Sequence, residues 1–242
     1  MAASEFTCLS VVIPAYNEER FIADLLAKVL AVDLSRFGLS KEVLVVDDGS
    51  RDRTAAIAGA IPGVTLHRLE RNAGKGAAVR AGIARAGGDL LVIQDADLEY
   101  EPDDYVPMLE ELQRSGADAV YGSRYLSVEG QPTRRPGQSL AAYLGGRSLS
   151  LVQWWFTGQY LTDTVTALKL FRAPVIKGID LRTSGFELDH EITSKVLGRG
   201  GRIREVPIRY YPRSREEGKK IGARDWFIAV RTYARYGRGR AV

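Results

Sequence analysis

The stretch Leu90-Leu91-Val92-Ile93-Gln94-Asp95-Ala96-Asp97 decides how this sequence folds. A short apolar run comes first, and two carboxylates follow at the point where the run ends. Continuous apolar runs are typical of strands that are covered on both faces of a parallel sheet. The same order, an apolar run and then a polar cluster, occurs three more times, with the clusters Asn17-Glu18, Asp47-Asp48 and Ser123-Arg124.

Apolar runs alternate with helical patterns through the first half of the chain. The predicted strands are Leu9–Ile13, Val43–Val46, Val64–Leu69, Leu90–Gln94 and Ala119–Tyr121. The predicted helices are one that ends near Ala31, followed by Thr54–Ala60, Gly74–Ala86 and Asp103–Arg114. This alternation predicts an α/β fold with a mostly parallel sheet flanked by helices. Ligands of such sheets bind beyond the carboxyl ends of the strands, so we expect the four clusters to converge on one crevice.

The second half is less regular. It predicts a loop at Gln131–Gly137, helical regions over Ser139–Leu161, Gly185–Leu197 and Arg224–Tyr236, and a strand over Arg204–Tyr211.

Composition narrows the class of protein. The 242 residues, 45% of them apolar, suffice for one α/β domain with a full core. Cys8 is the only cysteine and excludes a disulfide framework within the chain, which favours a reducing cytoplasm. His67 and His190 are the only histidines and belong to no Cys/His cluster, so a zinc site is not expected. We expect no signal peptide and no transmembrane helix.

Charge is unevenly distributed along the chain. Residues 199–242 carry thirteen Arg and Lys against four Asp and Glu, whereas the first 198 residues are net acidic. A basic tail indicates a phosphate group or an anionic membrane surface as a partner, and a solvated charged face is the alternative. The acidic body and the lack of a nucleic-acid motif argue against a nucleic-acid partner.

The Asp95-Ala96-Asp97 segment is the strongest candidate for chemistry. Two carboxylates two residues apart at a strand end can share one hard cation, Mg²⁺ or Mn²⁺, with Asp97 as the expected direct ligand. A cation held there suits a diphosphate leaving group. A polar turn is the alternative for the pair taken alone.

Two further segments admit more than one interpretation. Asp47-Asp48-Gly49-Ser50 can accept hydrogen bonds from a nucleoside, while Ser50 or Asp52 can instead cap the next helix. Arg71-Asn72-Ala73-Gly74-Lys75-Gly76 can bind an anion at a helix start, or can form a tight loop with a solvated lysine.

These motifs, in their order and spacing, resemble the successive motifs of family 2 glycosyltransferases. The resemblance rests on residues 12–19, 46–54, 71–76, 94–100 and 122–125, and with C-terminal motifs it covers about residues 9–222. Within the family, the sequence is most similar to the dolichyl- and polyprenyl-phosphate sugar synthase branch. The resemblance implies a GT-A (Rossmann-like) fold, a nucleoside-diphosphate sugar donor and an inverting mechanism.

The resemblance also implies roles for individual residues. The donor-binding set is Pro14, Tyr16, Glu18, Asp48, Lys75, Asp95, Ala96 and Asp97, with Asp95 and Asp97 holding the cation and Gln94 and Glu99 supporting them. Arg124, Arg213 and Lys219 are the implied phosphate-binding residues. Asp189 and Glu191 match the two acids of the acceptor-side helix, with Asp189 the expected base and Glu191 the second candidate.

We therefore expect one GT-A domain, with residues 9–125 as the nucleotide-sugar half and residues 126–222 as the acceptor half. Residues 223–242 form a basic amphipathic helix. The leading hypothesis is a metal-assisted transfer of a hexose, from a UDP- or GDP-linked donor, to a polyprenyl phosphate at the inner face of the membrane.

A soluble family 2 enzyme acting on a saccharide or small-molecule hydroxyl is the alternative, and a non-catalytic nucleotide-sugar binder is the third. The aromatic residues of Ser139–Leu161, among them Trp154 and Trp155, suit either a membrane interface or packing against the sheet.

Overall fold

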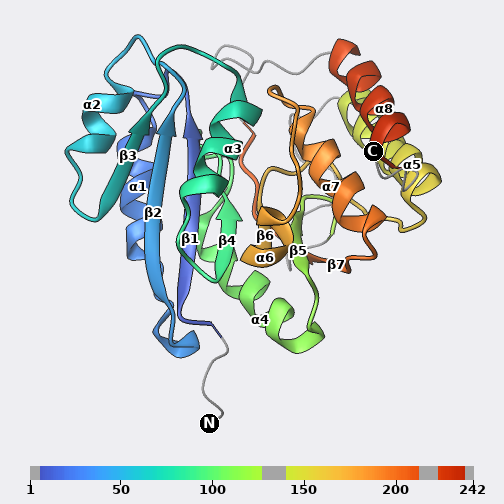
Figure 1. The fold of residues 1–242 in the computed structure, drawn as a ribbon, viewed down its shortest axis with the longest axis horizontal. Helices are drawn as coiled ribbons and strands as arrows, with labels where there is room; N and C mark the ends of the chain where they lie inside the picture. The colour runs from blue at the N-terminus through green and yellow to red at the C-terminus, as the bar shows by residue number, and fades with distance from the viewer. Residues whose placement is uncertain (1–5, 127–139, 213–222, 238–242) are drawn as a thin grey trace.

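The computed structural model describes residues 6–126, 140–212 and 223–237. Within these residues, seven strands form one sheet with the order β3-β2-β1-β4-β6-β5-β7 (Figure 1). The strands are β1 (Cys8–Ala15), β2 (Ser40–Asp47), β3 (Val64–Arg68), β4 (Leu90–Ile93), β5 (Ala119–Ser123), β6 (Lys169–Arg172) and β7 (Ile203–Pro207). Pairing between β4 and β6 joins the two halves of the chain in one continuous sheet.

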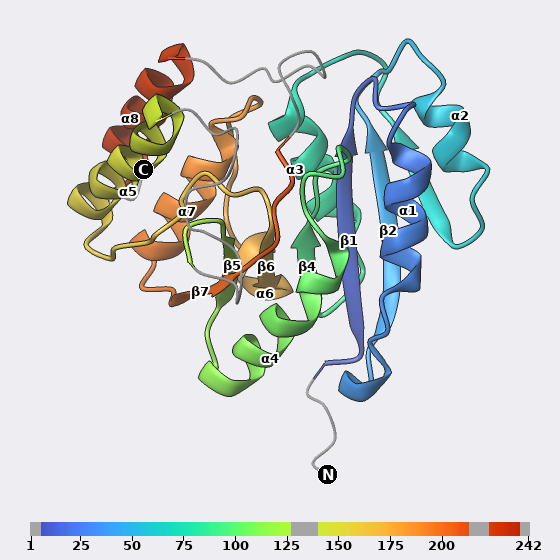
Figure 2. The same ribbon diagram turned by 180° about the vertical axis from the view of Figure 1, so that it is seen from behind.

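Helices cover both faces of the sheet, as the two opposite views show (Figures 1 and 2). On one face lie α1 (Ile22–Ala31) and α4 (Tyr105–Ser115), and on the other α3 (Lys75–Arg85), α6 (Ala173–Lys177) and α7 (Leu188–Gly198). The short α2 (Thr54–Gly59) packs beside β3. Helices α5 (Leu140–Thr157) and α8 (Ala223–Tyr236) lie side by side beyond the edge of the sheet that β7 forms. Two short 3₁₀ turns complete the described elements, at Ser35–Phe37 and Pro102–Asp104.

Strand β4 shows why the apolar runs fold as they do. Leu90 and Val92 pack into the core on the α1 and α4 side, whereas Leu91 and Ile93 pack into the core on the α3 and α7 side. Because successive side chains of a strand point to opposite faces, a strand between two helical layers needs apolar residues at every position. The prediction of a mostly parallel α/β sheet flanked by helices is confirmed.

The strand directions bring the polar clusters to one edge. Strands β1, β2, β3 and β4 are mutually parallel. Strand β6 is antiparallel to both β4 and β5, so β5 runs in the direction of β4. The residues that follow β1, β2, β4 and β5 therefore all lie at the same edge of the sheet, which is the arrangement expected from the sequence.

The structure differs from the sequence predictions mainly in the second half. Strand β6 and helix α6 were not predicted. The strand expected over Arg204–Tyr211 leaves the sheet after Pro207, and the segment beyond it returns to the site through an isolated bridge between Tyr100 and Tyr210. The expected loop Gln131–Gly137 lies outside the described residues. None of the helices in the described parts of the chain combines the length and the apolar character of a membrane span.

Candidate active site

The loops after β1 and β2 form one wall of the site. Asn17, which adopts a left-handed backbone conformation (φ 55°), donates its N–H to Ser50 Oγ at 2.9 Å. The N–H of Glu18 donates to Thr54 Oγ1 at 2.8 Å. Pro14 pairs in register with Val46, and Tyr16 and Glu18 follow half-buried at the strand end. The structure thus brings Pro14, Tyr16 and Glu18 to the edge where the donor is expected.

Asp48 is buried and holds the loop that precedes α3. Its carboxylate accepts the N–H of Ala73 at 2.7 Å and the N–H of Gly74 at 2.9 Å. A carboxylate bound by two backbone donors is fixed in orientation. Asp48 therefore supports the wall of the site by positioning the residues before Lys75, and its contact with a nucleoside stays a prediction.

The segment Asp95-Ala96-Asp97 is braced from both sides. Gln94 is fully buried, donates from Nε2 to the carbonyl of Asp95 at 3.1 Å and accepts the Tyr105 hydroxyl at 2.8 Å. After the acids, Leu98 has a left-handed backbone (φ 58°), a conformation that is costly for a residue with a branched side chain and that clusters at functional sites.

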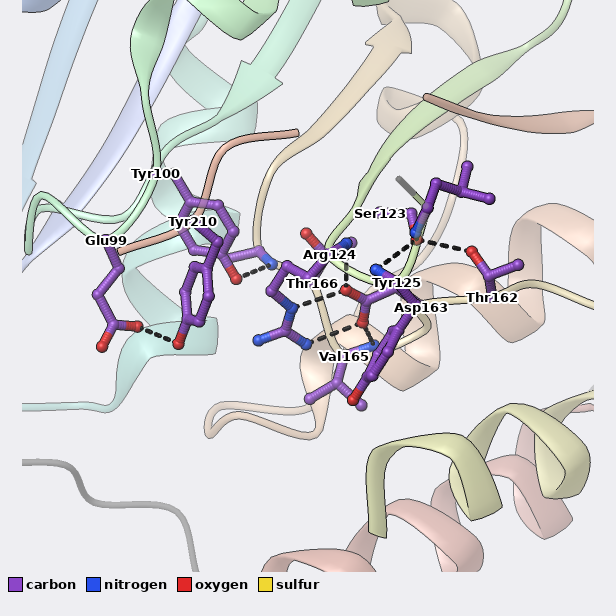
Figure 3. A network of polar contacts seen from close by, with 12 residues as sticks. Glu99, Tyr100, Ser123, Arg124, Tyr125, Thr162, Asp163, Val165, Thr166 and Tyr210 are labelled. Carbon is purple, nitrogen blue, oxygen red and sulfur yellow. Dashed lines mark hydrogen bonds and ion pairs between the residues drawn. The ribbon is translucent and has the colours of Figure 1, made fainter. Parts of the chain in front are cut away.

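Glu99 closes this turn. Its N–H donates to Asp97 Oδ1 at 3.2 Å, and its carboxylate accepts the Tyr210 hydroxyl at 2.7 Å (Figure 3). The turn that carries both acids is therefore held to the segment after β7, and the role of Gln94 and Glu99 in supporting a cation site stays a prediction.

The donor set of Asp95 and Asp97 fits a hard divalent cation, because two carboxylates supply oxygen ligands and leave positions for phosphate oxygens and water. Among residues 6–126, 140–212 and 223–237, no three or more His, Cys, Asp or Glu side chains are grouped to hold a metal ion. A cation held by Asp95 and Asp97 therefore stays a prediction.

Lys75 lies between the two halves of the site. Its Nζ is 2.7 Å from Asp95 Oδ1 and 3.9 Å from Asp189 Oδ2. On the far side, Asp189 Oδ1 pairs with Nζ of Lys169, a lysine of β6 with no exposed surface. Four charges of alternating sign therefore run from β6 to the end of β4.

This row of charges shifts the ionisation of its members. Burial alone lowers the pKa of Lys75, but the neighbouring Asp95 and Asp189 outweigh it and hold the pKa above its usual range. Burial alone raises the pKa of Asp189, but Lys169 and Lys75 outweigh it and hold the pKa below its usual range. Asp189 is therefore an ionised carboxylate with weak basicity.

The glycines on either side of Lys75 make room for the backbone of residues 183–185. A Cβ on Gly76 would lie 2.8 Å from Gly185 O and 2.9 Å from Thr183 O, and one on Gly74 would lie 2.3 Å from Ser184 O. The Ala77 N–H donates to the same Ser184 carbonyl at 3.2 Å. Residues 183–185 thus rest in a notch at the start of α3, and this contact fixes Lys75 near Asp189.

Glu191 belongs to the scaffold of this contact. Its buried carboxylate accepts the N–H groups of Arg182 and Thr183, the Thr183 hydroxyl at 2.6 Å and the Lys195 ammonium at 2.5 Å. Asp189, two residues earlier, is the acid that lines the small pocket beside Lys75. Glu191 therefore holds residues 182–183 in place, and Asp189 is the acid of the two that faces the site.

Arg124 is oriented by a carboxylate (Figure 3). Its Nε and Nη2 donate to Asp163 at 2.6 and 2.8 Å, and its guanidinium lies over the Tyr210 ring at 5.1 Å. The N–H of Asp163 donates in turn to Glu205 at 2.9 Å. Arg124 thus reaches the site as part of a buried network, whereas Arg213 and Lys219 lie outside the described residues.

Sequence reasoning missed Lys169 and Asp163 as residues of the site. A lysine in the short run Lys169–Arg172 looks like the exposed position of a polar strand, and only its pairing with a residue 20 positions later makes it internal. Asp163 lies in a segment that the resemblance covers, but its partner Arg124 is 39 positions earlier. For Lys169, the available sequence signal is its position between the apolar residues Leu168 and Leu170.

The arrangement is an α/β fold in which polar loops, a carboxylate pair and a row of charges of alternating sign lie at one sheet edge. The family model "Glycosyl transferase family 2" matches residues 10–176. The chain belongs to glycosyl transferase family 2.

Two curated relatives carry lipid-phosphate names. The dolichol-phosphate mannosyltransferase of Pyrococcus furiosus is 34% identical over 221 residues, which is 88% of this chain and 59% of that protein. The dodecaprenyl-phosphate galacturonate synthase of Rhizobium johnstonii is 34% identical over 212 residues, 85% of this chain and 59% of that protein. This chain thus spans about three fifths of the length of these relatives.

Solved structures show the same fold. Mannosyl-3-phosphoglycerate synthase of Rubrobacter xylanophilus superposes with a TM-score of 0.74 at 23% identity, covering 98% of this chain and 76% of that chain. Glucosyl-3-phosphoglycerate synthase of Mycobacterium tuberculosis, solved with Mn²⁺, UDP-glucose and phosphoglyceric acid, gives 0.70 at 20% identity, covering 95% and 80%. The predicted GT-A fold is confirmed.

Proposed function

We propose that this protein is an inverting glycosyltransferase that moves a hexose from a nucleoside-diphosphate sugar to a polyprenyl phosphate, with the help of Mg²⁺ or Mn²⁺. The names of the two curated relatives support a lipid-phosphate acceptor. The structural observation that best supports a phosphate as the acceptor is the position of Asp189 between Lys75 and Lys169.

The donor end of the site suits a departing diphosphate. Asp95 and Asp97 would hold the cation, which supplies positive charge to the phosphate oxygens when bound. Pro14, Tyr16 and Glu18 would line the nucleoside pocket beside the loop that Asp48 holds. Stabilisation of the charge that grows on the leaving group is usually the largest catalytic effect in such a site.

The acceptor end favours a group that is already ionised. A hydroxyl acceptor needs a base, because alcohols hardly ionise near neutral pH. Asp189 would be a weak base, since both lysines stabilise its ionised form. A phosphate monoester, with a second pKa near ~6, is mostly anionic at neutral pH and needs little help from a base. Asp189 would then position Lys75 and the acceptor rather than take a proton.

Arg124 would meet an acceptor phosphate in this scheme. A guanidinium that is planar and held by a carboxylate presents its N–H groups in a fixed direction, which suits an oxyanion. Asp163 holds the edge of the Arg124 guanidinium by hydrogen bonds, and the Tyr210 ring lies against the face of the guanidinium. Arg213 and Lys219 stay predicted phosphate ligands.

Helices α5 and α8 offer a surface for a membrane. On α5, Trp155 is 74% exposed, and Trp154 and Leu151 are exposed as well. On α8, Phe227 is 68% exposed, and the exposed arginines of the same helix are Arg224, Arg231 and Arg235. Exposed tryptophan together with arginine suits a lipid surface with anionic headgroups, so we propose a peripheral contact at the cytoplasmic face of the membrane.

The test of the function is an acceptor comparison with the purified protein. UDP- and GDP-sugars are offered with Mn²⁺ and either a polyprenyl phosphate or a panel of saccharide hydroxyls, and product is detected by mass spectrometry. We expect product on the polyprenyl phosphate, and we expect Asp189→Asn to lower kcat by about tenfold or less. Product on hydroxyls alone, with a loss of several orders of magnitude in Asp189→Asn, would overturn the lipid-phosphate assignment.

The membrane contact has its own measurement. Trp155→Ser should reduce binding to vesicles that contain anionic phospholipid by about tenfold, because it removes one large apolar side chain from the lipid contact. Leu30→Ser, at a partly exposed apolar position of α1, is the matched control and should leave binding unchanged. Equal binding of the Trp155 variant and the wild type would exclude this face.

A further inference from the structure

Lys75 is shared by two acids that belong to opposite sides of the site. Its ammonium pairs with Asp95 at 2.7 Å, and Asp189 lies 3.9 Å away on the other side. Asp95 belongs to the turn after β4, where the divalent cation is expected, whereas Asp189 belongs to α7 on the acceptor side. Lys75 therefore connects the two sides.

The ammonium of Lys75 occupies a carboxylate oxygen that the cation would also use. Lys75 and a divalent cation are both positive, and both would bind the Asp95 and Asp97 pair at short range. Like charges at such separations repel strongly inside a protein, where the effective dielectric constant is well below that of water. Binding of the cation and retention of the close Lys75–Asp95 pair therefore oppose each other.

Asp189 provides a second position for the ammonium. A movement of about 1 Å would bring Lys75 Nζ from 3.9 Å to hydrogen-bond distance of Asp189 Oδ2. Lys75 and Asp189 line the same small pocket, together with Gly185 and Leu188. The backbone of Lys75 stays in place because residues 183–185 rest in the notch made by Gly74 and Gly76, so the exchange needs only side-chain rotation.

We propose that Lys75 exchanges between two acids: it holds Asp95 in the cation-free protein and moves to Asp189 when a divalent cation binds at Asp95 and Asp97. This proposal rests on the proposed function, which supplies the cation. As a consequence, cation binding at Asp95 and Asp97 brings the Lys75 ammonium closer to Asp189 before the sugar is transferred to the acceptor. Lys75 is thus a positioning residue that couples the two sides.

The test is a titration with Mn²⁺ alone, without nucleotide, in which free Mn²⁺ is measured by electron paramagnetic resonance. Lys75→Met should bind Mn²⁺ about tenfold more tightly than the wild type, because the competing charge is gone. Lys75→Arg keeps the charge and should stay within about threefold of the wild type. Arg71→Met removes an exposed positive charge from the same loop and should change the affinity less than twofold.

The second position is tested by Asp189→Asn. In this variant the Lys75 ammonium lacks the carboxylate to which it would move, so it should stay paired with Asp95. The affinity for Mn²⁺ should therefore fall by at least about threefold. A circular dichroism spectrum and a melting curve establish for each variant that the fold is kept. An Mn²⁺ affinity of Lys75→Met equal to or weaker than that of the wild type overturns the exchange, as does unchanged affinity in Asp189→Asn.

A double variant separates this failure from a failure of the cation site itself. Asp95→Asn with Asp97→Asn should lose Mn²⁺ binding. If the double variant binds Mn²⁺ as well as the wild type, the cation part of the proposed function fails. If it loses Mn²⁺ while Lys75→Met is unchanged, only the exchange is overturned.

Discussion

Gly76→Ala tests the contact that places Lys75 between the two halves of the site. Gly76 lies inside α3 with an ordinary helical backbone, so the intrinsic preference of a helix for alanine predicts a gain of about 1 kcal/mol. The structure predicts the opposite sign. The new Cβ would lie 2.8 Å from both Gly185 O and Ser184 C, and these are backbone atoms that cannot rotate away.

The size of the effect follows from the overlap. Residues 183–185 would have to withdraw by about 0.6 Å to restore van der Waals contact, and overpacking of this kind typically costs about 1–3 kcal/mol. After the helix gain is subtracted, we expect a net loss of up to about 2 kcal/mol. For a chain of this length, a loss of about 2 kcal/mol corresponds to a fall in Tm of roughly 4–8 °C.

Gly145→Ala is the matched control. Gly145 also lies inside a helix, α5, but apart from the neighbouring backbone of that helix, no heavy atom of residues 6–126, 140–212 and 223–237 lies within 4 Å of the Cβ position. This variant should gain up to about 1 kcal/mol and melt at a higher temperature. Both variants are compared with the wild type by differential scanning calorimetry. A rise in Tm for Gly76→Ala as large as that for Gly145→Ala would refute the proposed packing of residues 183–185 against α3.

Two further predictions concern buried charge. Lys169→Met should lower the free energy of unfolding by about 3 kcal/mol at pH 7, because it removes an ammonium that lies closer to the buried Asp189 carboxylate than that of Lys75 does. Adding Asp189→Asn should recover most of this loss in urea denaturation, and a single variant within about 1 kcal/mol of the wild type would contradict the buried pair. Burial holds the pKa of His190 at about 4, below its ordinary value of 6.5, so its neutral form contributes stability above pH 6.5 that is lost as the pH falls toward 4. The wild type should therefore lose about 2 kcal/mol more than His190→Gln between pH 7 and pH 5, and parallel pH profiles would contradict this assignment.

The first half of the fold could be predicted because its information is local. The apolar runs of β1, β2 and β4 are bounded by polar clusters, and their predicted and observed limits differ by at most a few residues. The parallel direction of the strands then brings the clusters to one edge without further information. The positions of Asp95 and Asp97 follow from these two facts alone.

The second half could not be predicted to the same extent, because its elements depend on distant partners. Strand β6 is only four residues long and begins with Lys169, whose burial depends on Asp189 in a helix that forms later in the chain. The strand predicted through Tyr211 ends at Pro207, since the next residues turn toward Asp104, whose carboxylate accepts the Arg209 N–H at 2.7 Å. No local pattern specifies either pairing.

The segment Gly74-Lys75-Gly76 shows how a motif can be recognised for one reason and required for another. From sequence, its glycines suggested an anion-binding helix start or a tight loop. In the structure, the backbone of residues 183–185 packs against both glycines, where a side chain would leave no space. Glu191 holds these residues in place by accepting the N–H of Thr183. The same contact sets the distance between Lys75 and Asp189. Glu191, the two glycines and Lys75 therefore depend on one another, and a change in Glu191 or in either glycine should alter the position of the Lys75 ammonium between Asp95 and Asp189.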